Sequence, residues 1–204
     1  MRLDPSDLSP RERYALLTGT VVPRPIGWIS TVSDQGTPNL APFSYFMVAS
    51  ADPPTVAFSG GTRADGPKDT VRHALRSGAF VANLVDRASL DAMNATSVDA
   101  PTGVDEFSHA GVEPAPSERI APPRVASAPV AFECEVSAHL ELGANTVVFG
   151  TVVVAHLRDG IRGADGRIDV RALDPVARLA GTAYATLGEI VERARPSWND
   201  RARR

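Results

Sequence analysis

A glycine-containing segment, residues 61–70 (GTRADGPKDT), carries residue types that bind phosphate. It nearly matches the loop G-x-x-x-x-G-K-[ST] of nucleotide hydrolases, but a proline and an aspartate are inserted around its lysine, which argues against that class. The chemistry of a phosphate site is still present. Arg63 and Lys68 supply positive charge, and Thr70 supplies a hydroxyl donor. A helix is expected to begin near Asp69, where free backbone N–H groups favour an anion.

Lys68 is the only lysine of the chain, since the other 20 of its 21 basic residues are arginines. A compositional drift toward arginine does not explain why this lysine is kept. A phosphate site would explain it, because an ammonium group is a compact phosphate ligand. The simpler alternative is that Asp69 caps the helix and Lys68 is a solvated surface residue. The segment alone leaves both interpretations open.

A second segment, residues 39–46 (NLAPFSYF), places an amide, hydroxyls and three aromatic rings within eight positions. The simpler interpretation is a bent barrel strand whose aromatic side chains pack in the core. Beside a phosphate site, however, an amide-rich and aromatic strand suits a phosphorylated planar cofactor.

Several enzyme classes and metal sites find no support in the sequence. No G-x-S-x-G elbow is present, and no G-x-G-x-x-G follows a predicted strand, so we expect neither a serine hydrolase nor a Rossmann site. The histidines are too far apart to suggest a metal site, and no cysteine stands at ligand spacing. They are His73, His109, His139 and His156.

Composition and charge narrow the class of protein further. The 204 residues, 43% of them hydrophobic, predict one domain over residues 1–204, with a core about 20–196 and a basic tail about 197–204. With a net charge of −3, the chain lacks the overall positive charge that is typical of a nucleic-acid-binding protein. The sequence contains no run of about 18 apolar residues, so we expect no membrane helix. Its charged first residues do not suggest a signal peptide. Because Cys134 is the only cysteine, we expect a cytoplasmic protein.

The pattern of apolar residues and turn formers predicts a mainly β fold with short helices. Strands do not alternate regularly with helices, which favours an antiparallel barrel over a doubly wound parallel sheet. A loop is predicted over 60–67 and a surface excursion over 97–129, while 176–191 mixes helical and strand character. Helices are predicted over 9–17, 69–78, 88–95 and 104–109, and strands over 26–33, 55–59, 79–85, 130–142 and 146–157.

Four stretches together resemble the flavin reductase-like family of FMN-binding split barrels. This family includes flavoredoxins and the reductase components of two-component monooxygenases. The resemblance extends in order from about residue 22 to residue 196, and the order of the motifs makes it specific. The stretches are PRPIGWISTVSDQGTPNLAPFSYFMVASADPPTVAFS, GPKDTVRHALRSGAFVANLV, MNATS and GVDEFSHAG.

The resemblance implies a split β-barrel that forms a homodimer and binds FMN near the subunit interface. It places Trp28, Ile29, Ser30 and Thr31 along the flavin ring or ribityl chain, and Asn39, Ala41, Phe43 and Ser44 at the border of the ring. It places Ser59, Arg63, Lys68, Asp69 and Thr70 around the phosphate, and Asn83 beside the ribityl chain. In the later stretch LDPVARLAG, Ala180 stands where the family often has a second glycine, which puts a flavin contact of Tyr184 in doubt.

The function implied first is an NAD(P)H-dependent FMN reductase that passes electrons to an acceptor, such as a partner monooxygenase. The cofactor carries that chemistry, so no catalytic acid, base or metal ligand is nominated. A second hypothesis is an FMN-carrying electron-transfer protein with little NAD(P)H activity. A third is a binding module that has lost its flavin. No nicotinamide motif is visible, so NADH and NADPH stay open as donors.

Overall fold

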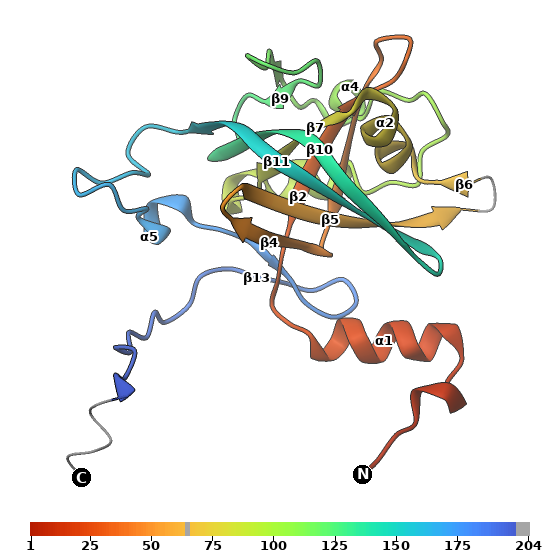
Figure 1. Cartoon of the computed structure of the whole chain (residues 1–204), viewed down its shortest axis with the longest axis vertical. Coiled ribbons are helices and arrows are strands. Elements are labelled where there is room, and N and C mark those ends of the chain that lie inside the picture. Colours follow the sequence, from red (N-terminus) through yellow and green to blue (C-terminus); the bar gives the residue numbers. More distant parts are fainter. Residues whose placement is uncertain (64–65, 199–204) are drawn as a thin grey trace.

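An antiparallel sheet forms the centre of the molecule in the computed structural model, which describes residues 1–63 and 66–198 (Figure 1). Its strands follow the order β3-β2-β7-β10-β11-β5-β4, and the short β6 pairs with β5. These strands are β2 (Gly27–Val32), β3 (Pro38–Phe43), β4 (Phe46–Ala51), β5 (Pro54–Arg63), β6 (Gly66–Pro67), β7 (Ala79–Leu84), β10 (Val130–Leu142) and β11 (Asn145–Leu157).

The long β10–β11 hairpin joins the two halves of this sheet. Residues 131–135 of β10 pair with β7, while residues 145–151 of β11 pair with β5. The register between β10 and β11 shifts after Glu133 and again after Val136, and such bulges bend a strand pair and increase its twist. The hairpin can therefore turn from one half of the sheet to the other without a break, as the diagonal course of β10 and β11 in Figure 1 shows.

Short helices and strand pairs surround the sheet. The helices are α1 (Pro10–Thr20), α2 (Asp69–Ser77), α3 (Leu90–Ala95), α4 (Glu106–Ala110) and α5 (Val170–Leu173), with 3₁₀ turns at Pro5–Asp7 and Arg87–Ser89. Two small sheets consist of β1 (Arg24–Pro25), β12 (Ala177–Arg178) and β13 (Tyr184–Ala185), and of β8 (Pro114–Ala115) and β9 (Arg124–Val125). None of the helices in the described part of the chain has the length and apolarity that crossing a bilayer requires.

Most predicted elements are confirmed within a few residues. The capping box of Ser9 and Glu12 begins α1, and Gly78 ends α2 in the left-handed conformation, with a φ of 72°. The loop predicted over 60–67 is wrong for the described residues, because β5 continues through Gly60 and Gly61, which pair with β11, and residues 66–67 form β6. A Cβ on Gly60 would lie 2.4 Å from Val71 Cγ2, so the glycine lets α2 pack against the strand.

Other differences concern the last third of the chain. Residues 176–191, whose helical or strand character the sequence leaves open, contain only the two short strands β12 and β13. Such short pairs depend on tertiary contacts rather than on local propensity. Most of the basic tail expected at 197–204 lies outside the described residues.

Two apolar clusters lie on opposite faces of β2, which explains why the strand is apolar on both sides. Ile29 belongs to the inner cluster together with Phe58 and Phe80, whose ring centroids are 5.1 Å apart. Trp28 belongs to the second cluster, which packs against Met93 of α3 and Phe107 of α4. Both faces of β2 are therefore covered.

The inner cluster is also tightly packed at Gly150 of β11. A Cβ at this position would lie 2.5 Å from two ring carbons of Phe80 and 2.8 Å from Cys134 Cβ. We predict that Gly150→Ala lowers the free energy of unfolding by about 1–3 kcal/mol, because overpacking a filled core displaces its side chains. Denaturant unfolding measures this change. Gly188→Ala is the control, since nothing lies within 4 Å of its added Cβ, and an equal loss in both variants would contradict the packing argument.

Candidate functional site

A narrow polar cavity of about 60 Å³ lies where β3 meets the start of α2. It brings together seven residues that the sequence predicts for a cofactor site, namely Asn39, Ala41, Phe43, Arg63, Lys68, Asp69 and Thr70. Pro42, Thr96, Ser97, Val98 and Glu106 complete its lining.

The cavity lining carries two cations, Arg63 and Lys68, beside the carboxyl groups of Asp69 and Glu106. Arg63 forms an ion pair with Asp99 at 2.5 Å, but the Asp99 side chain is 84% exposed, and exposed pairs contribute little. Arg63 Nε is buried and donates to no atom of the described residues. Lys68 has neither an ion pair nor a side-chain hydrogen bond within the described ranges 1–63 and 66–198. A buried donor without a partner is rare and indicates a ligand at this position.

The first turn of α2 adds backbone donors to the same cavity. Lys68 is its N-cap residue and makes no capping hydrogen bond with its side chain, so the first N–H groups keep their capacity for an anion. The part of the simpler alternative in which Asp69 caps the helix is therefore wrong, whereas Lys68 is exposed, as that alternative expects. The Asp69 carboxylate instead accepts hydrogen bonds from Arg72 and from the Thr102 hydroxyl.

A buried polar network forms the floor of the cavity. Asn39 Oδ1 accepts hydrogen bonds from the hydroxyls of Thr31 (3.1 Å) and Thr70 (2.8 Å). Asn39 Nδ2 donates to Glu106 Oε2 at 2.8 Å, and the Leu40 N–H donates to the same oxygen at 3.1 Å. The network ties β2, β3, α2 and α4 together. Because the Thr70 hydroxyl proton is used here, Thr70 offers a ligand its backbone N–H rather than its hydroxyl.

Glu106 is the titratable member of this network. Its side chain is buried, and this burial raises the pKa of the Glu106 carboxyl, although the Leu40 N–H and the Asn39 amide oppose the shift. Sequence reasoning does not single out Glu106. The stretch GVDEFSHAG contains it, but only the fold shows that its carboxylate turns back toward β3.

Two larger cavities continue from the narrow one. A polar cavity of about 400 Å³ shares Pro42, Lys68 and Ser97 with it. An apolar cavity of about 500 Å³ shares Arg24 and Ser44 with the polar one. The three cavities therefore form a series of neighbouring spaces along β3 and the segments beside it.

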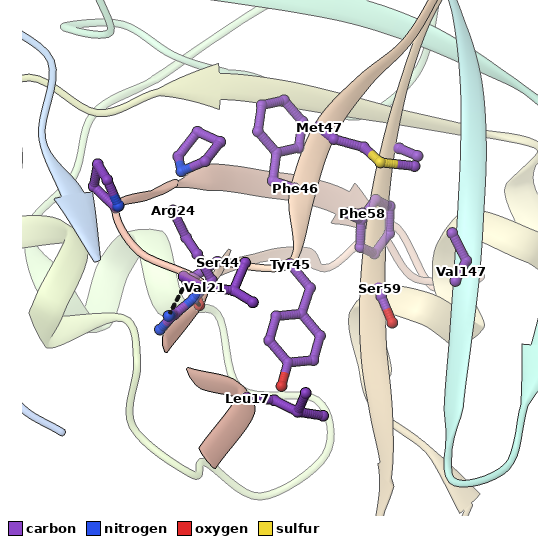
Figure 2. Close-up of a pocket in the computed structure, with 13 residues that line it drawn as sticks. Leu17, Val21, Arg24, Ser44, Tyr45, Phe46, Met47, Phe58, Ser59 and Val147 are labelled. Carbon is purple, nitrogen blue, oxygen red and sulfur yellow. Dashed lines mark hydrogen bonds between the residues drawn. The ribbon is translucent and has the colours of Figure 1, made fainter. Parts of the chain in front are cut away.

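Figure 2 shows the apolar cavity, with Arg24 and Ser44 on one side and Phe58, Ser59 and Val147 on the other. Ser44 and Ser59, both predicted as cofactor residues, line this space and not the narrow cavity. Their hydroxyl oxygens accept hydrogen bonds, Ser44 from Arg24 Nε at 3.3 Å and Ser59 from the Asn145 amide at 3.1 Å.

The remaining predicted side chains line none of these three cavities. The Trp28 indole N–H donates to the Thr96 hydroxyl at 2.8 Å. The Asn83 amide donates to the Trp28 carbonyl and accepts from the Val125 N–H, both at 2.9 Å. These groups hold β2, β7 and β9 in place behind the site. The five side chains, each 1% exposed or less, are Trp28, Ile29, Ser30, Thr31 and Asn83.

Thiol and metal chemistry have little basis in the structure. Burial raises the pKa of the Cys134 thiol to about 12, so the thiolate needed for nucleophilic attack is scarce near neutral pH. Over residues 1–63 and 66–198, no three histidine, cysteine, aspartate or glutamate side chains are grouped so that they could hold a metal ion.

Comparison with known proteins agrees with this geometry. The family model "Flavin reductase like domain" matches residues 18–173. An uncharacterized protein from Halalkalibacterium halodurans is 39% identical over 204 residues, 97% of each chain. Nitrilotriacetate monooxygenase component B from Bacillus cereus has a TM-score of 0.92 at 34% identity and covers 95% of this chain and 98% of its own. A protein with a split barrel domain from Shewanella frigidimarina NCIMB 400 has a TM-score of 0.84 at 22% identity. The match covers 97% of this chain and 100% of that protein. The predicted split barrel is confirmed.

The buried network leads to a prediction about pH. Because the pKa of Glu106 is raised in the folded state, folding favours its protonated form. The contribution of the protonated form to the free energy of unfolding is complete at low pH. It is lost as the pH rises from about 4.3, the pKa of Glu in the unfolded chain, through the pKa in the folded protein. Glu106→Gln keeps an oxygen that accepts both hydrogen bonds but does not titrate.

We therefore expect the wild type to lose stability relative to Glu106→Gln as the pH rises from 4 to 8. Urea unfolding at a series of pH values measures this difference. A difference that stays constant over the series, or that changes in the opposite direction, would show that burial does not control this carboxyl.

Proposed function

The chain belongs to the flavin reductase-like domain family, and we propose that it is an FMN-binding oxidoreductase that takes electrons from NADH or NADPH. The observation that carries the proposal lies at the start of α2, where the buried Arg63 Nε, beside Lys68, donates to no atom of residues 1–63 and 66–198. A phosphate monoester carries the negative charge and the acceptor oxygens that such a site requires.

In this proposal the narrow cavity holds the FMN phosphate. Lys68 and Arg63 supply the charge, and the first N–H groups of α2, including that of Thr70, donate hydrogen bonds. Ala41 and Phe43 of β3 border the rest of the molecule. Ser44 and Ser59 contribute from the neighbouring apolar cavity. The five buried residues of β2 and β7 support these strands rather than touch the cofactor with their side chains.

When bound, FMN would supply the hydride and electron-transfer chemistry between a nicotinamide donor and an acceptor. The chain binds and orients the cofactor, and its fixed charges set the electrostatic surroundings. No side chain is assigned as an acid or base. An electron carrier with bound FMN but little NAD(P)H activity remains the second candidate, because a flavoredoxin from Desulfovibrio vulgaris (Miyazaki F) shares the fold with a TM-score of 0.75.

We further propose that the protein is a cytoplasmic homodimer. Apolar side chains around the mouth of the apolar cavity are exposed, including Leu17 of α1 (58%) and Met47 of β4 (51%). Exposed apolar groups gathered in one region indicate an interface. In Figure 1, α1 lies beside the sheet and not within it, which leaves this helix free to pack against a second copy.

The phosphate assignment predicts the behaviour of Lys68→Ala. Loss of a charge-assisted contact should weaken FMN binding by about 1.5–3 kcal/mol, or roughly 10- to 150-fold. Titration of the FMN-free protein with FMN, followed by flavin absorbance, measures the affinity. Arg76→Ala is the control, because Arg76 lies at the other end of α2 in an exposed pair with Asp34. Unchanged FMN affinity in Lys68→Ala would refute the assignment.

The choice between reductase and carrier is tested on the same preparation. Stopped-flow mixing of the FMN-loaded protein with NADH and with NADPH should bleach the flavin absorbance within the turnover time of a reductase. Bound flavin that neither donor reduces would favour the carrier. A protein that binds no flavin at all would contradict both.

The homodimer predicts that Met47→Glu dissociates the protein, since a charge would be buried without a partner. Light scattering coupled to size exclusion gives the mass, which should fall from that of a dimer to that of a monomer. Ile168→Glu, at another exposed apolar position (48%), should leave the mass unchanged. A wild-type protein that is monomeric at micromolar concentration would overturn the homodimer.

A further inference from the structure

The FMN proposed for the narrow cavity must extend beyond it, because about 60 Å³ is too small for the whole cofactor. The polar cavity of about 400 Å³ is the adjoining space, since it shares Pro42, Lys68 and Ser97 with the narrow one. The apolar cavity shares no lining residue with the narrow one. Under the proposed function, the flavin ring therefore lies against the lining of the polar cavity.

Two arginines of this lining lie directly opposite each other across a pair of antiparallel strands. Arg24 of β1 is the register partner of Arg178 of β12, and both residues line the polar cavity. Like charges directly opposite one another destabilise a sheet. Neither arginine forms an ion pair with a carboxylate of residues 1–63 and 66–198. Negative charge in the cavity would relieve this repulsion.

Arg24 is held in place by groups that carry no net charge. Its guanidinium donates to the carbonyls of Thr18 (2.6 Å), Val21 (3.0 Å) and Leu179 (3.0 Å) and to the Ser44 hydroxyl. The residue is 7% exposed, so water screens its charge poorly. Arg24 is thus a fixed positive charge at the wall of the cavity.

Arg178 is also oriented by neutral groups. Its guanidinium donates to the Tyr184 hydroxyl at 2.6 Å and to the Gly181 carbonyl, and it lies 4.7 Å from the centroid of the Tyr184 ring. The Tyr184 hydroxyl donates in turn to Asn94 Oδ1 at 3.0 Å. The position of Arg178 is therefore determined, and no carboxylate of the described residues offsets its charge.

The rest of the lining adds a third cation and no acid. It includes Lys68 but neither an aspartate nor a glutamate, whereas the narrow cavity contains Asp69 and Glu106. A guanidinium group does not give up its proton in proteins. The two arginines therefore stabilise a negative charge in the polar cavity by electrostatic attraction, without protonating the group that carries it.

Reduction changes the charge of a flavin ring but not that of its phosphate. A hydride adds an electron pair and one proton to a ring that is uncharged when oxidised, so the reduced ring is an anion unless it takes up a further proton. Charge placed near the ring is one of the ways in which a protein sets the properties of its flavin. Fixed cations beside the ring consequently stabilise the reduced form more than the oxidised form.

We propose that Arg24 and Arg178 make the polar cavity bind reduced FMN more tightly than oxidised FMN, so that the flavin stays on the protein after reduction. The inference rests on the proposed function for the presence of FMN. Tighter binding of the reduced form raises the midpoint potential of bound FMN above that of free FMN, by about 30 mV for each tenfold preference. Electrons then pass to the acceptor from bound flavin and do not leave as free reduced FMN.

The test measures the midpoint potential of FMN on the full chain, anaerobically and against a reference dye, and compares it with that of free FMN. The wild type should raise the potential. Arg178→Gln should reduce the preference for reduced FMN about tenfold, which lowers the bound potential by about 30 mV. It should leave the affinity for oxidised FMN almost unchanged, since the oxidised ring is uncharged.

Two further variants separate charge from structure. Arg178→Lys should keep most of the wild-type potential, because it keeps the positive charge. Arg171→Gln, at an exposed arginine of α5, should leave the potential unchanged. The fate of the flavin is followed separately: after reduction of the loaded protein by dithionite, anaerobic gel filtration should elute the reduced FMN together with the protein.

Several results would overturn the proposal. A bound potential equal to or below that of free FMN would do so, as would release of the flavin on reduction. An unchanged potential in Arg178→Gln, or an equal decrease in Arg178→Lys, would show that the charge is not the cause. The comparison of bound with free FMN needs no variant, so it decides the question even if Arg178→Gln does not fold. A wild type that binds no FMN would refute the proposed function, whereas FMN bound without a shift in potential would refute only this proposal.

Discussion

The hydrogen bonds of Asn39 to Thr31, Thr70 and Glu106 fix the relative position of β2, β3, α2 and α4 beside the narrow cavity. A buried amide and a buried carboxyl must both be satisfied, because an unpaired polar group in the interior costs far more than one hydrogen bond gains. Asn39 meets this requirement by accepting from Thr31 and Thr70 and by donating to Glu106. Any other register of β3 against α2 or α4 would leave at least one of these groups unpaired. The network therefore sets the distance between β3 and Lys68.

The same network uses the hydroxyl donors beside the cavity and leaves the charged side chains available. The hydroxyls of Thr31 and Thr70 bond inward, so the groups still free to meet a ligand are the cations and the first N–H groups of α2. Cations and the free N–H groups at a helix start favour an anion over a neutral ligand. Burial raises the pKa of the Glu106 carboxyl, and the Leu40 N–H and the Asn39 amide oppose that shift.

The sequence predicts those parts of the fold and of the site that are determined by residues close together in the chain. The capping box of Ser9 and the glycine stop of α2 are local, and they agree with the structure. The strand through Gly60 and Gly61 is not local, because β11 supplies its partners. For the site, the sequence identifies the segments but not the direction of each side chain. Asn83 has the same amide group as Asn39 but lies fully buried between two backbones, and no spacing rule separates the two cases.

The pairing of Arg24 with Arg178 could not have been found from either segment alone, because the two strands lie near opposite ends of the chain. Arg24 also bonds the carbonyls of Thr18 and Val21 at the end of α1, and that of Leu179 after β12. One guanidinium thus anchors both ends of the chain beside the polar cavity. It also lines the apolar cavity, whose mouth carries the exposed groups of α1 and β4. A single side chain, held by four hydrogen bonds, therefore forms part of the walls of both cavities.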